Sequence, residues 1–245
     1  MKVSASFICM LAGILCYPFA GCSKGPASNT PASSLANASS GNDTTIRSKT
    51  YLALGDSYTI GQSVDPSLRF PAQTAAILNS GKTLVTPPEY IATTGWTTAN
   101  LLTAIQNQNP KGPYDMVSLL IGVNDQFQHL DTAGYRLRFT QLLQKSILLA
   151  GNRPLHVFVL SIPDYSVTPF GQSYQPQQTA KEINWFNAIN REITATYHCN
   201  WLDITPSTRE AATNNTLVAD DGLHPSGKEY RKWAEALAPM MRAIL

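Results

Sequence analysis

Residues 51–62 read YLALGDSYTIGQ and contain the clearest structural signal in the chain. Residues 51–54 are apolar without alternation, which is typical of a strand that is covered on both faces of a parallel sheet. Gly55 then precedes Ser57, and a glycine here permits a sharp turn into a helix that exposes the serine hydroxyl beside free backbone N–H groups. The tripeptide Gly-Asp-Ser alone also fits an ordinary loop, because Asp and Ser are common turn and N-cap residues.

The same alternation of apolar runs and helical periods continues along the chain. Further strands are expected at residues 90–92 (with a lead-in at 84–86), 116–121, 155–161 and 200–203. Helical periods lie at residues 72–78, 98–106, 133–149 and 177–197, and a last helix runs from Ser226 to about residue 243. Glu229, three residues after Ser226, gives that helix a capping-box signature. Five strand–helix units predict an α/β fold, a parallel sheet in a three-layer α/β/α sandwich, with ligands beyond the carboxyl ends of the strands.

Three further motifs fall at this edge of the predicted sheet. The second strand leads into Thr-Gly-Trp, in which Gly95 marks a tight turn or a close approach of the backbone. The third strand runs into Gly-Val-Asn-Asp, where the Asn124 amide suits either a developing oxyanion or a helix cap. Before the last helix, Asp221 stands three residues ahead of His224, close enough in a tight turn to accept a hydrogen bond from the ring. A surface loop that ends in a helix cap fits this last segment as well.

Taken in order, the four motifs resemble the four sequence blocks of the SGNH (GDSL-type) hydrolase family. The resemblance covers about residues 50–245, and YLALGDSYTIGQ and DGLHPSG are similar to bacterial esterase and lysophospholipase-like members. Tyr58 stands where the name-giving family motif has Leu. The resemblance implies a flavodoxin-like five-stranded parallel sheet of order 2-1-3-4-5.

The resemblance also implies roles for individual residues. Ser57 would be the nucleophile, His224 the general base and then acid, and Asp221 the carboxylate that orients the imidazole. The backbone N–H groups of Ser57 and Gly95 and the side-chain amide of Asn124 would form the oxyanion hole. An enzyme with these residue roles would need no metal and no cofactor.

The expected function is that of a serine ester hydrolase acting through an acyl-enzyme on short-acyl or lysophospholipid-type carboxylic esters. A carbohydrate O-acetylesterase acting on envelope or dietary glycans is an alternative within enzymes. A surface-tethered binding module that keeps the fold without turnover is a third interpretation. An α/β-hydrolase is excluded, because no Gly-x-Ser in the chain is followed by the second glycine of a Gly-x-Ser-x-Gly nucleophile elbow.

Composition narrows the partners. The formal net charge of +2 does not favour nucleic acid, and four His and four Cys without metal-ligand spacing do not favour a structural zinc. We expect the protein to be a monomer. Its expected partner is a substrate, a small-molecule, lipid or glycan ester.

The segment 162–171 after the fourth strand is long for a connection between strand and helix, and long loops at the ligand edge often carry binding residues. Our hypothesis is that Tyr165 or Phe170 borders the acyl pocket. Plainer interpretations apply to the remaining candidates: His129, His156 and His198 as packing or surface residues, Cys199 as a small core side chain, Trp185 and Phe186 as core residues of a helix, and Asp220 as a less suitable carboxylate than Asp221.

Residues 1–21 predict a lipoprotein signal peptide. Lys2 supplies a positive charge, and the apolar segment 7–20 is short for a membrane span. The small residues just before Cys22 resemble a bacterial lipobox, in which Phe19 replaces the usual aliphatic residue. An ordinary cleaved signal is the alternative.

After cleavage, Cys22 and Cys199 would be the remaining cysteines of the chain. Lipid on Cys22 would anchor the protein without spanning the membrane, whereas a Cys22–Cys199 disulfide is the structural alternative. Residues 22–45 predict a flexible linker, because they carry too little apolar surface to offset the entropy of ordering. We therefore expect a catalytic domain at residues 46–245 in an exported, periplasmic or surface-exposed lipoprotein of the cell envelope.

Overall fold

The structure is a computed structural model that describes residues 48–80 and 83–245. The predicted signal peptide, Cys22 and the predicted linker lie outside the described residues, so they stay predictions. Within the described ranges, no helix has both the length and the apolar character needed to cross a membrane.

Five parallel strands form one sheet in the order β2-β1-β3-β4-β5, which confirms the expected flavodoxin-like topology. The strands are β1 (Tyr51–Gly55), β2 (Glu89–Ala92), β3 (Met116–Leu120), β4 (Val157–Leu160) and β5 (Asn200–Leu202). The expected lead-in before β2 contributes one parallel bridge, between Lys49 and Val85. Every residue of β1, β3 and β4 is buried, which explains why their sequences do not alternate.

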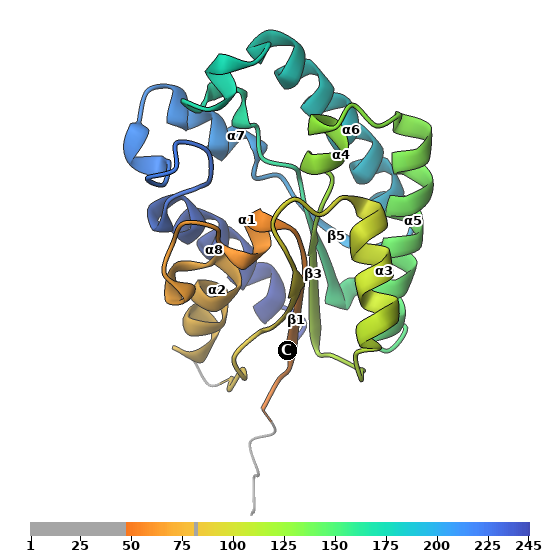
Figure 1. Cartoon of the computed structure of the whole chain (residues 1–245). Helices are drawn as coiled ribbons and strands as arrows, with labels where there is room; N and C mark the ends of the chain where they lie inside the picture. The colour runs from red at the N-terminus through yellow and green to blue at the C-terminus, as the bar shows by residue number, and fades with distance from the viewer. Residues whose placement is uncertain (1–47, 81–82) are drawn as a thin grey trace, which may run out of the picture. The chain divides into compact units, whose positions relative to one another are not determined.

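Helices cover both faces of the sheet (Figure 1). On one face α2 (Phe70–Asn79) packs against α8 (Gly227–Arg242), and on the other lie α3 (Thr98–Gln108), α5 (Thr132–Leu149) and α6 (Pro176–Thr196). Three short helices follow strands β1, β3 and β5: α1 (Ser57–Ile60), α4 (Val123–Phe127) and α7 (Thr205–Arg209). Single 3-10 turns are η1 (Pro66–Leu68), η2 (Pro154–His156), η3 (Tyr165–Val167), η4 (Gly171–Ser173), η5 (Glu210–Ala212) and η6 (Asn215–Leu217).

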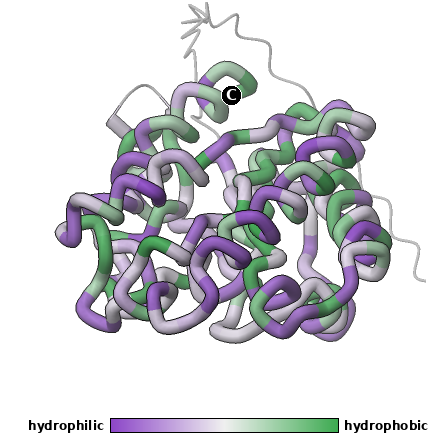
Figure 2. Tube along the Cα trace, turned by 90° about the horizontal axis from the view of Figure 1, so that it is seen from above, coloured by the Kyte–Doolittle hydropathy of each residue, from purple (hydrophilic) through white to green (hydrophobic). Residues whose placement is uncertain are grey.

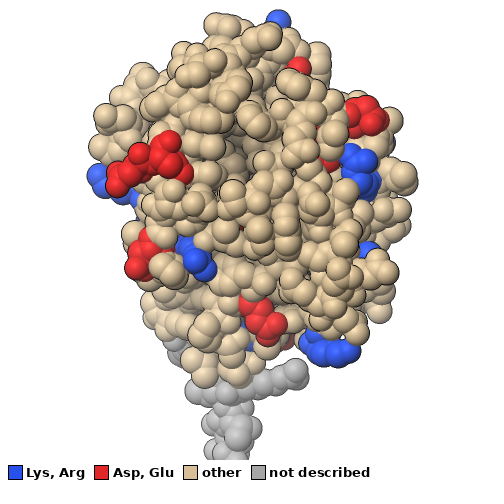
Figure 3. Space-filling view, viewed as in Figure 1, with Lys and Arg blue, Asp and Glu red and all other residues tan. Residues whose placement is uncertain are grey.

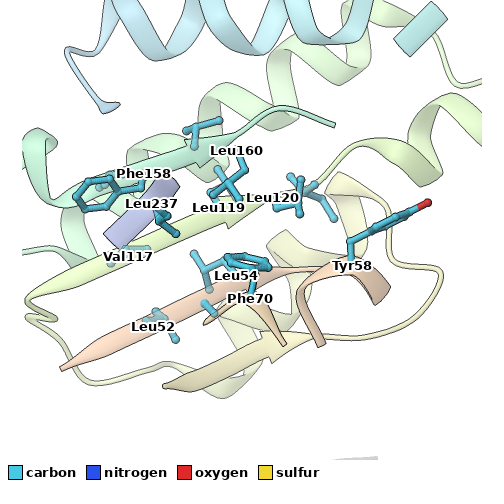
Figure 4. Packing of buried hydrophobic residues seen from close by; sticks show 14 of the residues in the cluster. Leu52, Leu54, Tyr58, Phe70, Val117, Leu119, Leu120, Phe158, Leu160 and Leu237 are labelled. Atoms are coloured by element: carbon cyan, nitrogen blue, oxygen red, sulfur yellow. The ribbon is translucent and has the colours of Figure 1, made fainter. Parts of the chain in front are cut away.

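The core lies between the sheet and these helices. Phe70 of α2 and Leu237 of α8 join Leu54 and Leu119 of the central strands in one hydrophobic cluster (Figure 4). Burying each such side chain contributes about 1.5–3 kcal/mol, so this cluster stabilises the contact between the sheet and its helices. Hydrophobic and hydrophilic residues alternate along the outer helices (Figure 2), as expected for helices with one face on a sheet.

The start of α8 corrects the predicted capping box. The Ser226 hydroxyl accepts a hydrogen bond from the Glu229 backbone N–H at 3.4 Å, as expected. The Glu229 side chain does not return the bond; it is buried and accepts hydrogen bonds from Ser207 Oγ at 2.6 Å and Trp233 Nε1 at 2.7 Å. The Ser226 N–H instead donates to the Leu217 carbonyl at 2.8 Å, which leaves the carboxylate free for core contacts.

The two ends of the described chain lie at the same edge of the sheet. Residues 48–50 lead into the amino end of β1, and the C-terminus lies beside that end (Figure 1). The carboxyl ends of the strands point to the opposite edge, where α1, α4 and α7 begin.

Candidate active site

Ser57 lies directly after β1, at the first position of α1. The Asp56 side chain caps this helix: its Oδ1 accepts a hydrogen bond from the Tyr58 backbone N–H at 3.0 Å. A side chain at Gly55 would overlap with the Leu120 carbonyl oxygen, so the strand can turn here only without a Cβ. The serine, 4% exposed, therefore sits at a helix start on the ligand edge of the sheet.

His224 and Asp221 are brought together in the turn before α8. The ring Nδ1 of His224 lies 2.6 Å from Asp221 Oδ2. The backbone N–H groups of Leu223 and His224 both donate to Asp221 Oδ1 at 2.9 Å. The ring of His224 also packs on Tyr58, the residue after Ser57, with 5.1 Å between ring centroids. Of the two adjacent aspartates, the one predicted from spacing is therefore the one in contact with the imidazole.

Gly95 and Asn124 line the same cavity as Ser57. Gly95 has φ +80°, a left-handed conformation that favours glycine, and a Cβ there would meet no atom within 4 Å. Asn124 Nδ2 donates one hydrogen bond to the Trp96 carbonyl at 2.9 Å, which fixes the amide and leaves its second N–H free to donate elsewhere. The N-cap of α4 is Gly122, so the alternative reading of Asn124 as a helix cap is wrong.

The cavity has a volume of about 130 Å³ and an aromatic wall. Tyr165 and Phe170, the two residues hypothesised to border it, both line it, together with Phe127 of α4. The three rings pack on one another with centroids 6.0 to 6.4 Å apart. Tyr165 turns its hydroxyl away from the rings and donates to Gln126 Oε1 at 2.9 Å. A serine, an imidazole and a fixed amide thus surround a small apolar space.

A sequence model of the GDSL-like lipase/acylhydrolase family matches residues 53–232, from β1 into α8. The chain belongs to this family. It is a carboxylic ester hydrolase by class, in agreement with the resemblance seen in its motifs.

Solved structures share the fold of this GDSL-like hydrolase at low sequence identity. A crystal structure of TesA is 18% identical with a TM-score of 0.64, over 80% of this chain and 100% of that one. The psychrotrophic esterase EstA from Pseudoalteromonas sp., inhibited by monoethylphosphonate, is 16% identical with a TM-score of 0.60, over 80% and 97%. Axe2, an acetylxylan esterase from Geobacillus stearothermophilus, is 17% identical with a TM-score of 0.61, over 80% and 95%. No curated protein matches the chain by sequence.

Ser63 is a residue of the GDSL-like site that the sequence motifs did not reveal. Its hydroxyl donates to Asp221 Oδ2 at 2.6 Å, across 158 positions of sequence. Partial burial alone would raise the pKa of Asp221, but the hydrogen bonds from Ser63, the His224 ring and two backbone N–H groups lower that pKa to about 2. Asp221 is therefore ionised at any pH near neutrality and able to hold the imidazole.

Asp125, next to Asn124, links three helices and was also missed. Its buried carboxylate accepts hydrogen bonds from the Thr98 backbone N–H at 2.8 Å and the Thr98 hydroxyl at 2.6 Å. Arg138 of α5 approaches the same carboxylate at 3.2 Å. Because Thr98 begins α3 just after the loop with Gly95, this network holds Gly95 and Asn124 at a fixed separation.

Asp56 of the GDS motif differs from Asp221 in its protonation. Its side chain is buried, and burial raises its pKa to about 8, with the Asp125 carboxylate adding to the rise and the Tyr58 N–H opposing it. Its Oδ2 has no hydrogen-bond partner among the described residues. At neutral pH the protonated form therefore predominates, and Asp56 serves as a neutral helix cap behind Ser57.

The remaining candidates lie outside the cavity that Ser57 lines. Cys199 is half-buried beside the Tyr197 carbonyl, and burial raises the pKa of its thiol to about 12. Phe186 is buried as expected, but Trp185 is 57% exposed, so the prediction that both belong to the core was wrong. In α6 the buried positions include Ile183, Phe186 and Asn190, a 3.6-residue period that Trp185 does not follow.

Proposed function

We propose that this GDSL-like hydrolase is a serine esterase that cleaves short-acyl esters through an acyl-enzyme. The observation that carries the proposal is the 2.6 Å contact between Asp221 and His224 Nδ1, beside a cavity that His224 shares with Ser57. A carboxylate on Nδ1 favours the tautomer that leaves Nε2 free to accept a proton. Asp221 also stabilises the imidazolium that forms when His224 takes the serine proton.

The remaining groups suit the next steps of acyl transfer. Ser57 Oγ attacks the ester carbonyl, and the negative charge that develops on the carbonyl oxygen is held by the backbone N–H groups of Ser57 and Gly95 and by Asn124 Nδ2. His224 returns its proton to the departing alcohol, and water then hydrolyses the ester bond to Ser57.

The size of the cavity favours a short acyl group. Typical pockets for drug-sized ligands measure roughly 300–1,000 Å³, whereas the cavity at Ser57 measures about 130 Å³. Phe127, Tyr165 and Phe170 close it on one side. A long lysophospholipid acyl chain would extend beyond this space.

We also propose that the chain is an exported lipoprotein anchored through Cys22. The support is the sequence: a charged amino end, a short apolar segment and small residues before the cysteine.

The esterase proposal is tested with p-nitrophenyl acetate, butyrate, octanoate and palmitate. We expect kcat/KM to fall with chain length beyond butyrate and the activity to disappear in Ser57→Ala. An exposed serine at the end of α2 supplies the control, and Ser80→Ala should keep full activity. A fluorophosphonate probe should add to Ser57 alone, as seen by mass spectrometry. Preference for palmitate would contradict the short-acyl assignment, and a folded protein with neither turnover nor adduct would favour the binding-module interpretation.

A further inference from the structure

A second, larger hollow lies on the other side of the aromatic wall. It has a volume of about 660 Å³, and it shares Phe127 and Tyr165 with the cavity at Ser57. It lies between α4 and the first turns of α6, near the top of Figure 1. An adjoining hollow of about 180 Å³ shares Gln126 and Glu182 with it and reaches Trp185. Together the two form one groove, here called the α4–α6 groove, that leads away from Ser57.

A series of hydrogen-bonded polar side chains forms the floor of the α4–α6 groove. The Tyr165 hydroxyl donates to Gln126 Oε1 at 2.9 Å, and Gln126 Nε2 donates to Glu182 Oε2 at 2.7 Å. Gln178 Nε2 donates to Glu182 Oε1 at 2.7 Å. Each carboxylate oxygen of Glu182 has a further lone pair, so it can accept a hydrogen bond from a ligand hydroxyl. These hydrogen bonds connect the wall of the cavity at Ser57 to the carboxylate acceptors in the groove.

Three aromatic side chains along the groove are exposed. Phe127 is 39% exposed, Tyr174 47% and Trp185 57%. Phe127 and Tyr174 also pack together, with ring centroids 5.6 Å apart. An aromatic face carries partial negative charge and attracts the C–H face of a sugar ring, which is partly positive. Flat aromatic surfaces beside amide and carboxylate acceptors therefore suit a hydroxylated ring better than an acyl chain.

Charge in this region argues against a phosphate-bearing alcohol. Among the described residues, no lysine or arginine lines the α4–α6 groove or the cavity at Ser57. Glu182 and Asp131 are the acidic residues that line the groove. The surface is hollowed in the upper part of the face in Figure 3, and the charged side chains seen there lie mainly towards its margins. A neutral ligand meets no electrostatic penalty here, whereas a phosphate would meet Glu182 and Asp131 with no lysine or arginine beside them. The basic side chain that lines the groove is the imidazole of His129.

We propose that the α4–α6 groove binds a neutral oligosaccharide that forms the alcohol part of the ester. The inference rests on the proposed esterase function and adds the substrate class: short acyl groups, such as acetyl, carried on a neutral glycan. The acyl group enters the small cavity at Ser57, and sugar rings extend across Phe127 towards Tyr174 and Trp185. The leaving group is then a sugar hydroxyl, which receives the proton from His224.

The test compares the full protein on p-nitrophenyl acetate and on O-acetylated xylo-, cello- and manno-oligosaccharides of one to six sugars. For at least one series, kcat/KM should rise with the number of sugars. Trp185→Ala should lower the ratio of kcat/KM for the hexasaccharide over p-nitrophenyl acetate by about fivefold, the loss of one exposed stacking contact. Glu182→Gln should lower the same ratio by removing a charged acceptor. Leu148→Ala, at a residue of α5 that is 64% exposed, is the matched control and should leave the ratio unchanged.

A direct binding measurement separates the groove from catalysis. Calorimetry on Ser57→Ala should detect the deacetylated hexasaccharide, and adding Trp185→Ala should weaken that binding. If Ser57-dependent hydrolysis of p-nitrophenyl acetate is present but no series gains from added sugars, the inference fails and the esterase proposal stands. Equal losses in Trp185→Ala and Leu148→Ala, or a preference for lysophosphatidylcholine over all three series, would also overturn it. Absence of ester turnover altogether would refute the esterase proposal itself, and with it the assignment of the sugar as an ester alcohol.

Discussion

The Asn124 amide holds the Trp96 carbonyl with one N–H and keeps a second N–H for the cavity. We expect Asn124→Ala to lower kcat for p-nitrophenyl butyrate by about 100- to 1000-fold, because an oxyanion donor is lost at the transition state. KM should change little. Gln128→Ala, at the exposed C-cap residue that follows α4, is the control. A loss of less than about tenfold in Asn124→Ala would remove Asn124 from the oxyanion hole.

Ser63 should act through Asp221. Ser63→Ala removes the 2.6 Å hydrogen bond to Asp221 Oδ2, so the pKa of Asp221 should move up from about 2 and the carboxylate should hold His224 less firmly. We expect kcat to fall by about fivefold with KM unchanged, since an exposed hydrogen bond to a charged group contributes roughly 1 kcal/mol. Ser63 has φ +66°, which Asn tolerates, so Ser63→Asn offers a donor again and should recover part of the loss. Equal kcat in wild type and Ser63→Ala would refute this positioning role.

The difference between predicted and missed residues is one of sequence distance. Asp221 and His224 stand three residues apart, so a local turn is enough to predict their contact. Ser63 and Asp221 are 158 positions apart, and only the tertiary fold brings them together. The protonation of Asp56 depends on complete burial, which no local pattern reports.

The buried carboxylate of Asp125 in α4 connects three helices, because it contacts Thr98 of α3 and Arg138 of α5. Asp125→Ala would leave Arg138 and the Thr98 N–H without their buried partner. We expect the free energy of unfolding to fall by about 2–3 kcal/mol, because the buried Thr98 N–H loses its acceptor whereas Arg138, which is 25% exposed, keeps access to water. Asp131→Ala, at the exposed N-cap of α5, is the comparison and should cost about 1 kcal/mol. Urea denaturation measures both, and similar losses in the two variants would contradict the role given to Asp125.

The long elements were predictable because burial imposes a period on them. The strands read as continuous apolar runs, since the central three are covered on both faces. The helices of four or five residues, α1, α4 and α7, are too short to show a period. Gly55 predicted the turn into α1, but no motif predicted α4 or α7. Trp185 could have been assigned to the surface, because the period of α6 already identifies its buried face.

For the whole molecule, Asp56 should make stability fall as pH rises. Its folded pKa of about 8 lies above the ordinary value of 3.8, so between about pH 4 and 8 the folded chain holds a proton that the unfolded chain has released. The free energy of unfolding therefore falls across that window. Asp56→Asn keeps an acceptor for the Tyr58 N–H without titrating, and the difference in Tm between variant and wild type should grow from pH 5 to 8. A constant difference would contradict the raised pKa.

Asp221 has the opposite effect on the pH dependence of the free energy of unfolding. Its folded pKa of about 2 lies below 3.8, so its stabilising effect is complete above about pH 4 and is lost as pH falls towards 2.

The predicted anchor is also tested on the whole protein. Cys22→Ser should move the protein from the membrane fraction of the producing cells to the soluble fraction, because the thiol that would carry the lipid is gone. Cys199→Ser is the control and should leave the distribution unchanged. Membrane association that survives Cys22→Ser would refute lipidation at this residue.

Both ends of the described chain lie at the edge of the sheet opposite Ser57, and this has a practical consequence for the substrates that an immobilised enzyme can meet. Across β1, about five residues at roughly 3.3 Å each separate the entry of the chain from the turn that carries Ser57. A support attached at residue 48 or at the C-terminus, whether a bead, a chip or a fused partner, holds the domain by the edge opposite the cavity at Ser57. The cavity at Ser57 then faces away from the support, towards polymers that are too large to diffuse beneath an immobilised protein.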